Sequence, residues 1–104
     1  MLRAIPSGPV KAPADFSTLK ALLEEQETFP MVYLHKFVGR NTPAFALAVA
    51  ELERNFPGAR REKMRASPNQ GHLALTYEFS AASADEIIEL LRATHLMIDV
   101  LVIL

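Results

Sequence analysis

The apolar residues of this chain follow two different periods, and each change of period marks the boundary of a predicted element. Between about residues 15 and 27 they recur every three to four positions, which places Phe16, Leu19 and Leu23 on one face of a helix. Asp15 is suited to cap the first turn, because its carboxylate accepts an otherwise unpaired backbone N–H. The pattern therefore predicts an amphipathic helix near the N-terminus.

From Met31 the period falls to two, which predicts a β-strand. Alternate side chains of this strand are expected to face the core: Tyr33, His35 and Phe37. The side chains between them are expected to line the opposite face: Val32, Leu34, Lys36 and Val38. The strand thus has apolar residues on both faces.

The rest of the chain repeats these two patterns. Thr42 followed by Pro43 predicts a helix start, and Ser83 with Glu86 has the spacing of a capping box ahead of another helix. The predicted elements in this region are a helix from Pro43 to Pro57, strands over 59–66 and 72–79 joined by a turn, a helix over about 84–94 and a strand over 98–104.

This order of elements predicts an α+β fold, the ferredoxin-like βαββαβ sandwich, with an antiparallel sheet ordered 4-1-3-2 and both helices on one face. The helix over about 15–27 is an addition to that fold. A length of 104 residues predicts one domain. We expect a flexible tail over 1–14 and a single domain over 15–104, whose core occupies 31–104.

Composition narrows the class of protein. Half of the residues are apolar, 22% are charged, the net charge is −1 and cysteine is absent. Disulfides, thiolate catalysis and sulfur-ligated zinc are thereby excluded. No stretch has the length and hydropathy of a membrane span or a secretory signal. These features predict a soluble cytoplasmic protein with no membrane partner and no cofactor.

One candidate binding site lies between the first strand and the helix that follows it. Gly39, Arg40, Asn41 and Thr42 precede a helix N-terminus, where unpaired N–H groups and the helix dipole attract anions such as those of a small effector. The alternative is a turn in which Gly39 supplies an unusual backbone angle, Thr42 caps the helix and Arg40 is solvated. The frequency of such caps favours this alternative.

The sequence contains no recognisable catalytic or metal-binding constellation. The histidines, His35, His72 and His95, lack metal-ligand spacing, and no serine lies in a nucleophile motif. His35 shares the core face of its strand, so we expect a hydrogen-bonded core histidine. The chain is predicted not to be an enzyme. The alternative, a small acylphosphatase-like enzyme, would rely on Arg40 and Asn41 and is less favoured.

Cations gather in the second predicted strand. If Met64 points inward, Arg61, Lys63 and Arg65 fall on the outer face of the sheet, the face turned away from the helices. RNA-recognition domains use that face, but they stack bases on aromatic rings, and none is predicted there. Protection of an exposed sheet edge explains the cations better. An RNA-binding module remains an alternative, and nucleic acid is not the favoured partner.

The outer face is also predicted to carry an apolar patch. Its members lie on the first and last strands: Val32, Leu34, Val38, Leu101 and Ile103. Such a patch requires a cover, because a monomer rarely leaves contiguous apolar surface exposed. The N-terminal helix, a second copy of the chain or another protein are the alternatives.

The segment "LKALLEEQETFPMVYLHKFVG" resembles the YbeD-like family, small bacterial proteins of unknown function. The resemblance extends from about Leu19 to Leu104, although the family's Ser-Ser-x-Gly-x-Tyr turn is replaced here by residues 67–72. It implies a ferredoxin-like domain similar to ACT modules, which bind small effectors or mediate contacts between chains. We therefore expect a non-enzymatic regulatory or adaptor domain, homodimeric or bound to another protein.

Overall fold

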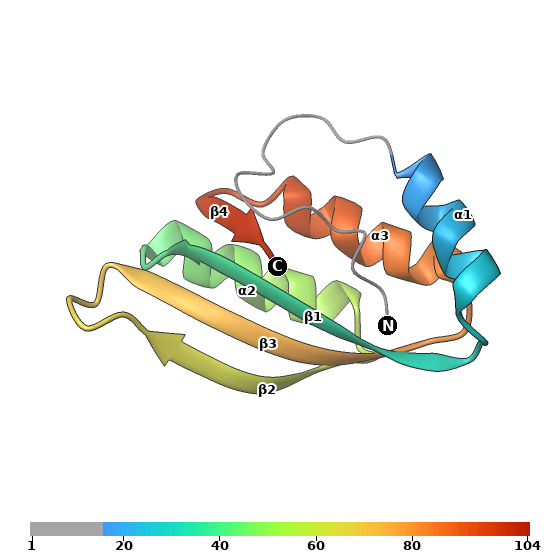
Figure 1. The fold of residues 1–104 in the computed structure, drawn as a ribbon. Coiled ribbons are helices and arrows are strands. Elements are labelled where there is room, and N and C mark those ends of the chain that lie inside the picture. Colours follow the sequence, from blue (N-terminus) through green and yellow to red (C-terminus); the bar gives the residue numbers. More distant parts are fainter. Residues whose placement is uncertain (1–15) are drawn as a thin grey trace.

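The computed structural model describes residues 16–104 and shows an α+β arrangement, an open four-stranded antiparallel sheet with three helices within that range (Figure 1). The elements are α1 (Ser17–Gln26), β1 (Met31–Arg40), α2 (Pro43–Asn55), β2 (Ala59–Ala66), β3 (His72–Ala81), α3 (Ala84–His95) and β4 (Val100–Ile103). The predicted tail over 1–14 and the predicted cap Asp15 lie outside the described residues. This architecture is compatible with a ferredoxin-like fold.

The strand order is β2-β3-β1-β4, which from the opposite edge is β4-β1-β3-β2. β1 pairs with β3 along its whole length, from Met31 opposite Ala81 to Arg40 opposite His72. β4 is much shorter and pairs only with the end of β1, at Phe37, Val38 and Gly39. β1 is therefore the central strand around which the other three are arranged.

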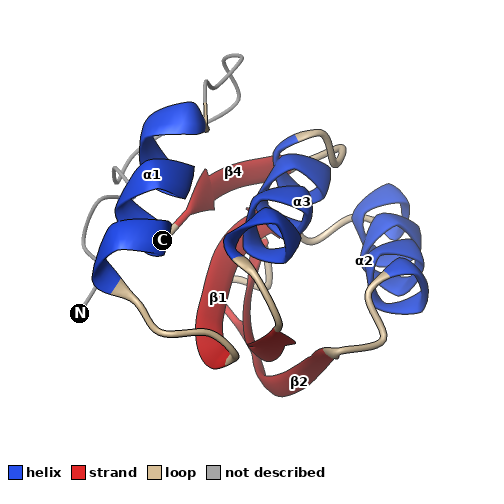
Figure 2. Cartoon of the chain, turned by 90° about the vertical axis from the view of Figure 1, so that its right-hand side faces the viewer, coloured by secondary structure: helices blue, strands red, loops and turns tan. Residues whose placement is uncertain are grey.

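The core lies between the sheet and the helices α2 and α3, which cover the same face of the sheet (Figures 1 and 2). The predicted inward set of β1 is confirmed, since Tyr33, His35 and Phe37 are all buried. The Phe37 ring stacks on Tyr77 of β3 and meets Phe45 of α2 edge-on. The alternation read from the sequence thus fixes which face of β1 is covered by helices.

α1 packs against α3 and stands beyond the β4 edge of the sheet (Figure 2). Its Leu23 is fully buried, and its Lys20 is 3.0 Å from a carboxylate oxygen of Asp85 at the start of α3. At the other end of α3, Phe16 meets the His95 ring edge-on. α1 therefore buries its apolar face against α3 and does not cover the outer face of the sheet, which was one of the predicted alternatives.

Position 39 requires glycine, because the side chain of Phe45 occupies the space that a Cβ atom would fill. A Cβ atom at this position would lie 2.4 Å from Cε1 of Phe45 and 2.9 Å from the Asp99 carbonyl oxygen. Gly39 is a strand residue that pairs with Leu73 of β3 and, beside a register shift, with Val100 of β4. The prediction that it supplies an unusual backbone angle was wrong, because the constraint is the close approach of the Phe45 ring.

Candidate functional site

The outer face of the sheet carries the apolar patch that the sequence predicts on β1. Val32 and Leu34 are each 57% exposed, whereas Tyr33 and His35, which alternate with them along the strand, are buried. Further along, Val38 lies opposite Val102 of β4, and Leu104 is 53% exposed just beyond the end of that strand. These five residues, Val32, Leu34, Val38, Val102 and Leu104, are called the apolar strip below.

Two of the predicted members of the patch lie elsewhere. Ile103 was expected on the outer face, but it pairs with Phe37 and is only 4% exposed. Leu101 is half-buried at a register shift between β1 and β4. The reason is local: Val100 lies opposite Gly39 and Val102 lies opposite Val38, so Leu101 is an extra residue in β4 and both Val100 and Ile103 point into the core. Val102 and Leu104 therefore occupy the outer positions.

A similar irregularity in β2 changes which cations lie on the outer face. The pairing of β2 with β3 shifts between Arg61 and Lys63, so Glu62 is an extra residue in β2. Lys63 and Arg65 lie on the outer face as predicted, but Arg61 pairs with the inward-facing Tyr77 and points toward α2. The prediction assumed perfect alternation along the strand, and the bulge reverses the faces of the residues before it, Arg60 and Arg61.

Lys36, Lys63 and Arg65 surround a shallow hollow of about 230 Å³ on the outer face. Its floor is low because two central positions, Ala74 and Thr76 of β3, carry small side chains. Val38 and Leu104 line the side nearest the apolar strip. The hollow and the strip therefore form one continuous surface, cationic toward β2 and apolar toward β4.

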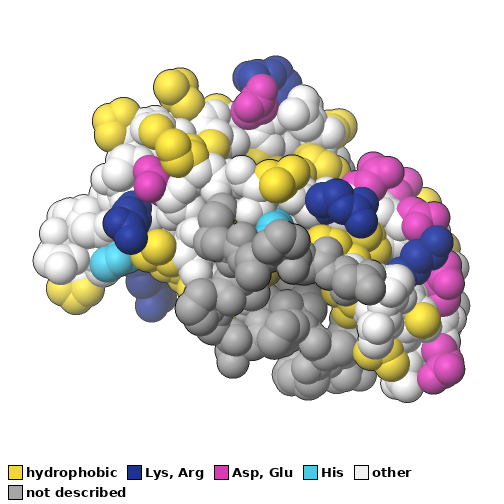
Figure 3. All heavy atoms as spheres, turned by 90° about the horizontal axis from the view of Figure 1, so that it is seen from above, with side chains coloured by type: hydrophobic (Ala, Val, Ile, Leu, Met, Phe, Trp, Pro, Cys, Tyr) yellow, Lys and Arg dark blue, Asp and Glu magenta, His cyan; other side chains and the backbone are white. Residues whose placement is uncertain are grey.

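The three cations of the hollow differ from the other arginine on this face. Arg60 is 2.6 Å from Glu62 and 2.6 Å from Glu78, so its charge is balanced by two carboxylates. Lys36, Lys63 and Arg65 form no ion pair with another residue in the range 16–104. By contrast, acidic and basic side chains lie beside each other at the right of Figure 3, which views the molecule from above. The hollow is thus a site of unbalanced positive charge.

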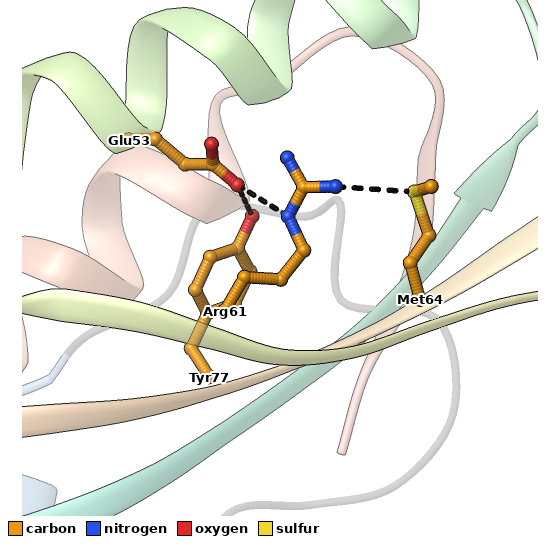
Figure 4. A network of polar contacts seen from close by, with 4 residues as sticks. All are labelled: Glu53, Arg61, Met64 and Tyr77. Atoms are coloured by element: carbon orange, nitrogen blue, oxygen red, sulfur yellow. Dashed lines mark hydrogen bonds and ion pairs between the residues drawn. The ribbon is translucent and has the colours of Figure 1, made fainter.

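A polar network fastens β2 to the helix layer (Figure 4). The Glu53 carboxylate of α2 accepts a hydrogen bond of 2.8 Å from Nε of Arg61 and one of 2.6 Å from the Tyr77 hydroxyl. The hydrogen bond from Arg61 lowers the pKa of Glu53, and desolvation raises the pKa of Tyr77. Sequence reasoning missed this network, because the bulge that turns Arg61 toward Glu53 leaves no signature in the residue pattern.

We expect Glu53→Gln to lower the free energy of unfolding by about 1 kcal/mol, because a charge-assisted pair with Arg61 becomes a neutral one. Glu51→Gln is the matched control, since Glu51 is exposed and its only ion pair in the described chain spans 3.9 Å to Arg54. Urea denaturation of both variants measures the difference. Equal free energies of unfolding for the two variants would show that the network does not stabilise the fold.

The side chains of Asn41 and Thr42 and the backbone of Arg40, three residues of the predicted anion site, form hydrogen bonds within the chain. The Thr42 hydroxyl accepts a hydrogen bond from the Phe45 N–H at 3.0 Å, as expected of a cap, and donates one of 2.6 Å to the Asp99 carboxylate. Arg40 donates its backbone N–H to the Asp99 carbonyl oxygen, and the Asn41 amide donates to the Gln70 carbonyl oxygen. Asp99 thus places a carboxylate of the chain itself beside the start of α2. An external anion at this loop stays a prediction.

His35 is the hydrogen-bonded core histidine that the sequence predicts. Its Nε2 atom is 2.9 Å from the Thr94 hydroxyl oxygen, and that hydroxyl donates its own hydrogen to the Leu90 carbonyl oxygen. Nε2 must therefore be the donor, which leaves Nδ1 unprotonated and without a hydrogen-bond partner among the residues described. His72 begins β3 and His95 ends α3, so the structure does not bring the three histidines together.

Within residues 16–104, no group of three or more histidine, aspartate or glutamate side chains is arranged to hold a metal ion. In the same range, no helix has the length and apolar character needed to cross a membrane.

No family model, curated protein or solved structure gives a significant match to this chain. The fold and the surface therefore define its class: a small α+β protein whose open sheet has one face covered by helices and one face exposed. The exposed face joins an apolar strip to a cationic hollow.

Proposed function

We propose that this chain is a non-enzymatic regulatory or adaptor domain that binds another protein through the outer face of its sheet. The observation that carries the proposal is the exposure of Val32 and Leu34 in the half of β1 that does not pair with β4, on the face that α1 leaves open. A strand with apolar residues on both faces ordinarily has both faces covered. An apolar patch that stays exposed on one face therefore marks an interaction site.

Two further observations support the proposal. The order of elements around the sheet fits the ferredoxin-like sandwich, a fold that serves many regulatory domains as well as enzymes. The resemblance of the segment from Leu19 onward to the YbeD-like family, and through it to ACT modules, favours binding over catalysis. The partner is a different protein or a second copy of the chain, and the test below separates the two.

The test compares two exposed leucines that differ in location. Leu34→Glu places a charge in the apolar strip, and Leu47→Glu places the same charge on α2, where Leu47 is 75% exposed. We expect proteins captured by the wild-type chain from a lysate to be depleted about tenfold or more by Leu34→Glu, because a buried anchor residue contributes about 2 kcal/mol. Leu47→Glu should retain them. Equal capture by both variants, or no capture by the wild type and no self-association, overturns the proposal.

Light scattering decides whether the captured partner is a second copy. A dimer that becomes a monomer with Leu34→Glu, and stays a dimer with Leu47→Glu, identifies the outer face as the subunit interface. A wild-type monomer that still captures a partner through Leu34 identifies a different protein.

A further inference from the structure

We propose that the partner binds this face through an acidic amphipathic segment, with apolar side chains on the apolar strip and carboxylates in the cationic hollow. This inference rests on the proposed function and specifies the chemistry of the partner. The observation behind it is the juxtaposition, on one surface, of exposed aliphatic side chains with three cations that have no carboxylate partner in the described chain.

The sheet register places the two halves of this surface within reach of one peptide. Lys63, Thr76 and Lys36 form one row across β2, β3 and β1, with Arg65 in the adjacent row. Strands are spaced about 4.8 Å apart, so Lys63 and Lys36 are separated by about 10 Å across the small Thr76 side chain. A carboxylate above Thr76 can contact ammonium groups on both sides.

Lys36 also joins the hollow to the apolar strip. It lies between Leu34 and Val38 on β1, and its carbonyl oxygen accepts the Leu104 N–H at 2.8 Å. A segment bound across β1 therefore contacts the Lys36 cation and the neighbouring apolar side chains of Leu34 or Val38 at the same time. Glutamate or aspartate interspersed with leucine, valine or phenylalanine is the composition that matches this alternation.

Other occupants fit the surface less well. A second copy would bring the same three unbalanced cations toward the interface, and like charges facing each other there weaken association. Single-stranded RNA is held by stacking on aromatic rings, whereas the rings of the described strands, Tyr33, Phe37, Tyr77 and Phe79, are all buried. An anionic bilayer presents a flat surface, which a hollow between long side chains does not complement.

The test uses the full chain, a short peptide of mixed glutamate, leucine and serine, and two matched peptides. One matched peptide replaces glutamate by lysine, and the other replaces leucine by serine. Nuclear magnetic resonance titration follows the backbone amides of Lys36, Ala74 and Thr76. We expect the acidic amphipathic peptide to shift these resonances, and each matched peptide to bind about tenfold or more weakly.

Charge reversal locates the binding. The double variant Lys63→Glu/Arg65→Glu is expected to weaken binding of the acidic peptide by about tenfold or more, and the effect should diminish above roughly 0.5 M salt. Lys63→Arg/Arg65→Lys, which keeps both charges, should bind within about twofold of wild type. The single variants Lys63→Glu and Arg54→Glu change the net charge equally, so Arg54→Glu on α2, which should bind like wild type, controls for the net charge of Lys63→Glu. Both variant positions are exposed, so the fold is expected to be retained.

Several results would overturn the inference. They are equal binding of the lysine peptide, absence of binding by the acidic peptide, preference for a mixed-sequence oligonucleotide or for anionic vesicles, and a dimer that buries the face. The capture experiment separates this inference from the proposed function. A partner that is lost with Leu34→Glu but retained with Lys63→Glu/Arg65→Glu shows that the face binds protein while the acidic segment is wrong.

Discussion

Lowering the pH from 7.5 to about 5 is expected to reduce the free energy of unfolding by about 2 kcal/mol through His35 alone. This side chain is completely buried, and desolvation lowers its pKa from an ordinary value of 6.5 to about 3. The groups that surround the imidazole are the rings of Tyr33, Phe37 and Tyr77 and the Thr94 hydroxyl, none of which carries a charge that would stabilise an imidazolium.

The direction of the effect follows from proton binding. Above pH 6.5 the imidazole is neutral in both the folded and the unfolded chain, so the stability contributed by its burial is fully present. Below that value the unfolded chain takes up a proton that the folded chain excludes, and about 1.4 kcal/mol is lost per pH unit until the folded pKa near 3 is reached. Glu53, whose pKa is lowered by Arg61, adds to the loss only below its ordinary value of 4.5.

The variant that isolates this effect is His35→Phe. Phenylalanine is similar in size, suits the aromatic surroundings and cannot be protonated, and the Thr94 hydroxyl keeps its hydrogen bond to the Leu90 carbonyl oxygen. Urea denaturation between pH 7.5 and about pH 5 should show a loss of about 2 kcal/mol in the wild-type chain and a much flatter profile in the variant. Profiles of equal slope would show that His35 is not the group responsible.

The sequence predicted the class of fold because the apolar periods of its elements are regular. β1 and β3 alternate without interruption, and the caps at Thr42 and Ser83 place the starts of α2 and α3. These signals are local, so they can be recognised before the chain is folded. The same regularity correctly separated the buried Tyr33, His35 and Phe37 from the exposed Val32 and Leu34.

The candidate surface was predicted less completely, because its outline depends on irregularities that have no local signature. A bulge at Glu62 turns Arg61 inward, and a second at Leu101 exchanges Ile103 for Val102 and Leu104 on the outer face. The position of α1 was likewise undetermined, since an apolar stripe specifies that a helix is buried and not against which neighbour. The sequence alone does not show the hollow, because it depends on the register that places Lys36 and Lys63 on either side of Thr76.

Gly39→Ala is expected to lower the free energy of unfolding by about 3 kcal/mol, toward the upper end of overpacking effects. The added methyl group would lie 2.4 Å from the Phe45 ring, which is fully buried, and 2.9 Å from the Asp99 carbonyl oxygen. That oxygen cannot easily retreat, because it accepts the Arg40 N–H at 2.9 Å. The ring or the β1–β4 pairing must move, and either movement disturbs the end of the sheet that carries Val38 and Val102.

Gly58→Ala is the matched control, since a Cβ atom there would meet its nearest neighbour, the Phe79 ring, at an ordinary 3.5 Å. Its stability should stay within about 0.5 kcal/mol of wild type. Combining Gly39→Ala with Phe45→Leu tests the cause, because a smaller side chain makes room for the methyl group. The double variant should be more stable than the sum of the two single losses predicts, by about 1 kcal/mol or more. Additive losses would show that the contact between Gly39 and Phe45 is not what requires a glycine in β1.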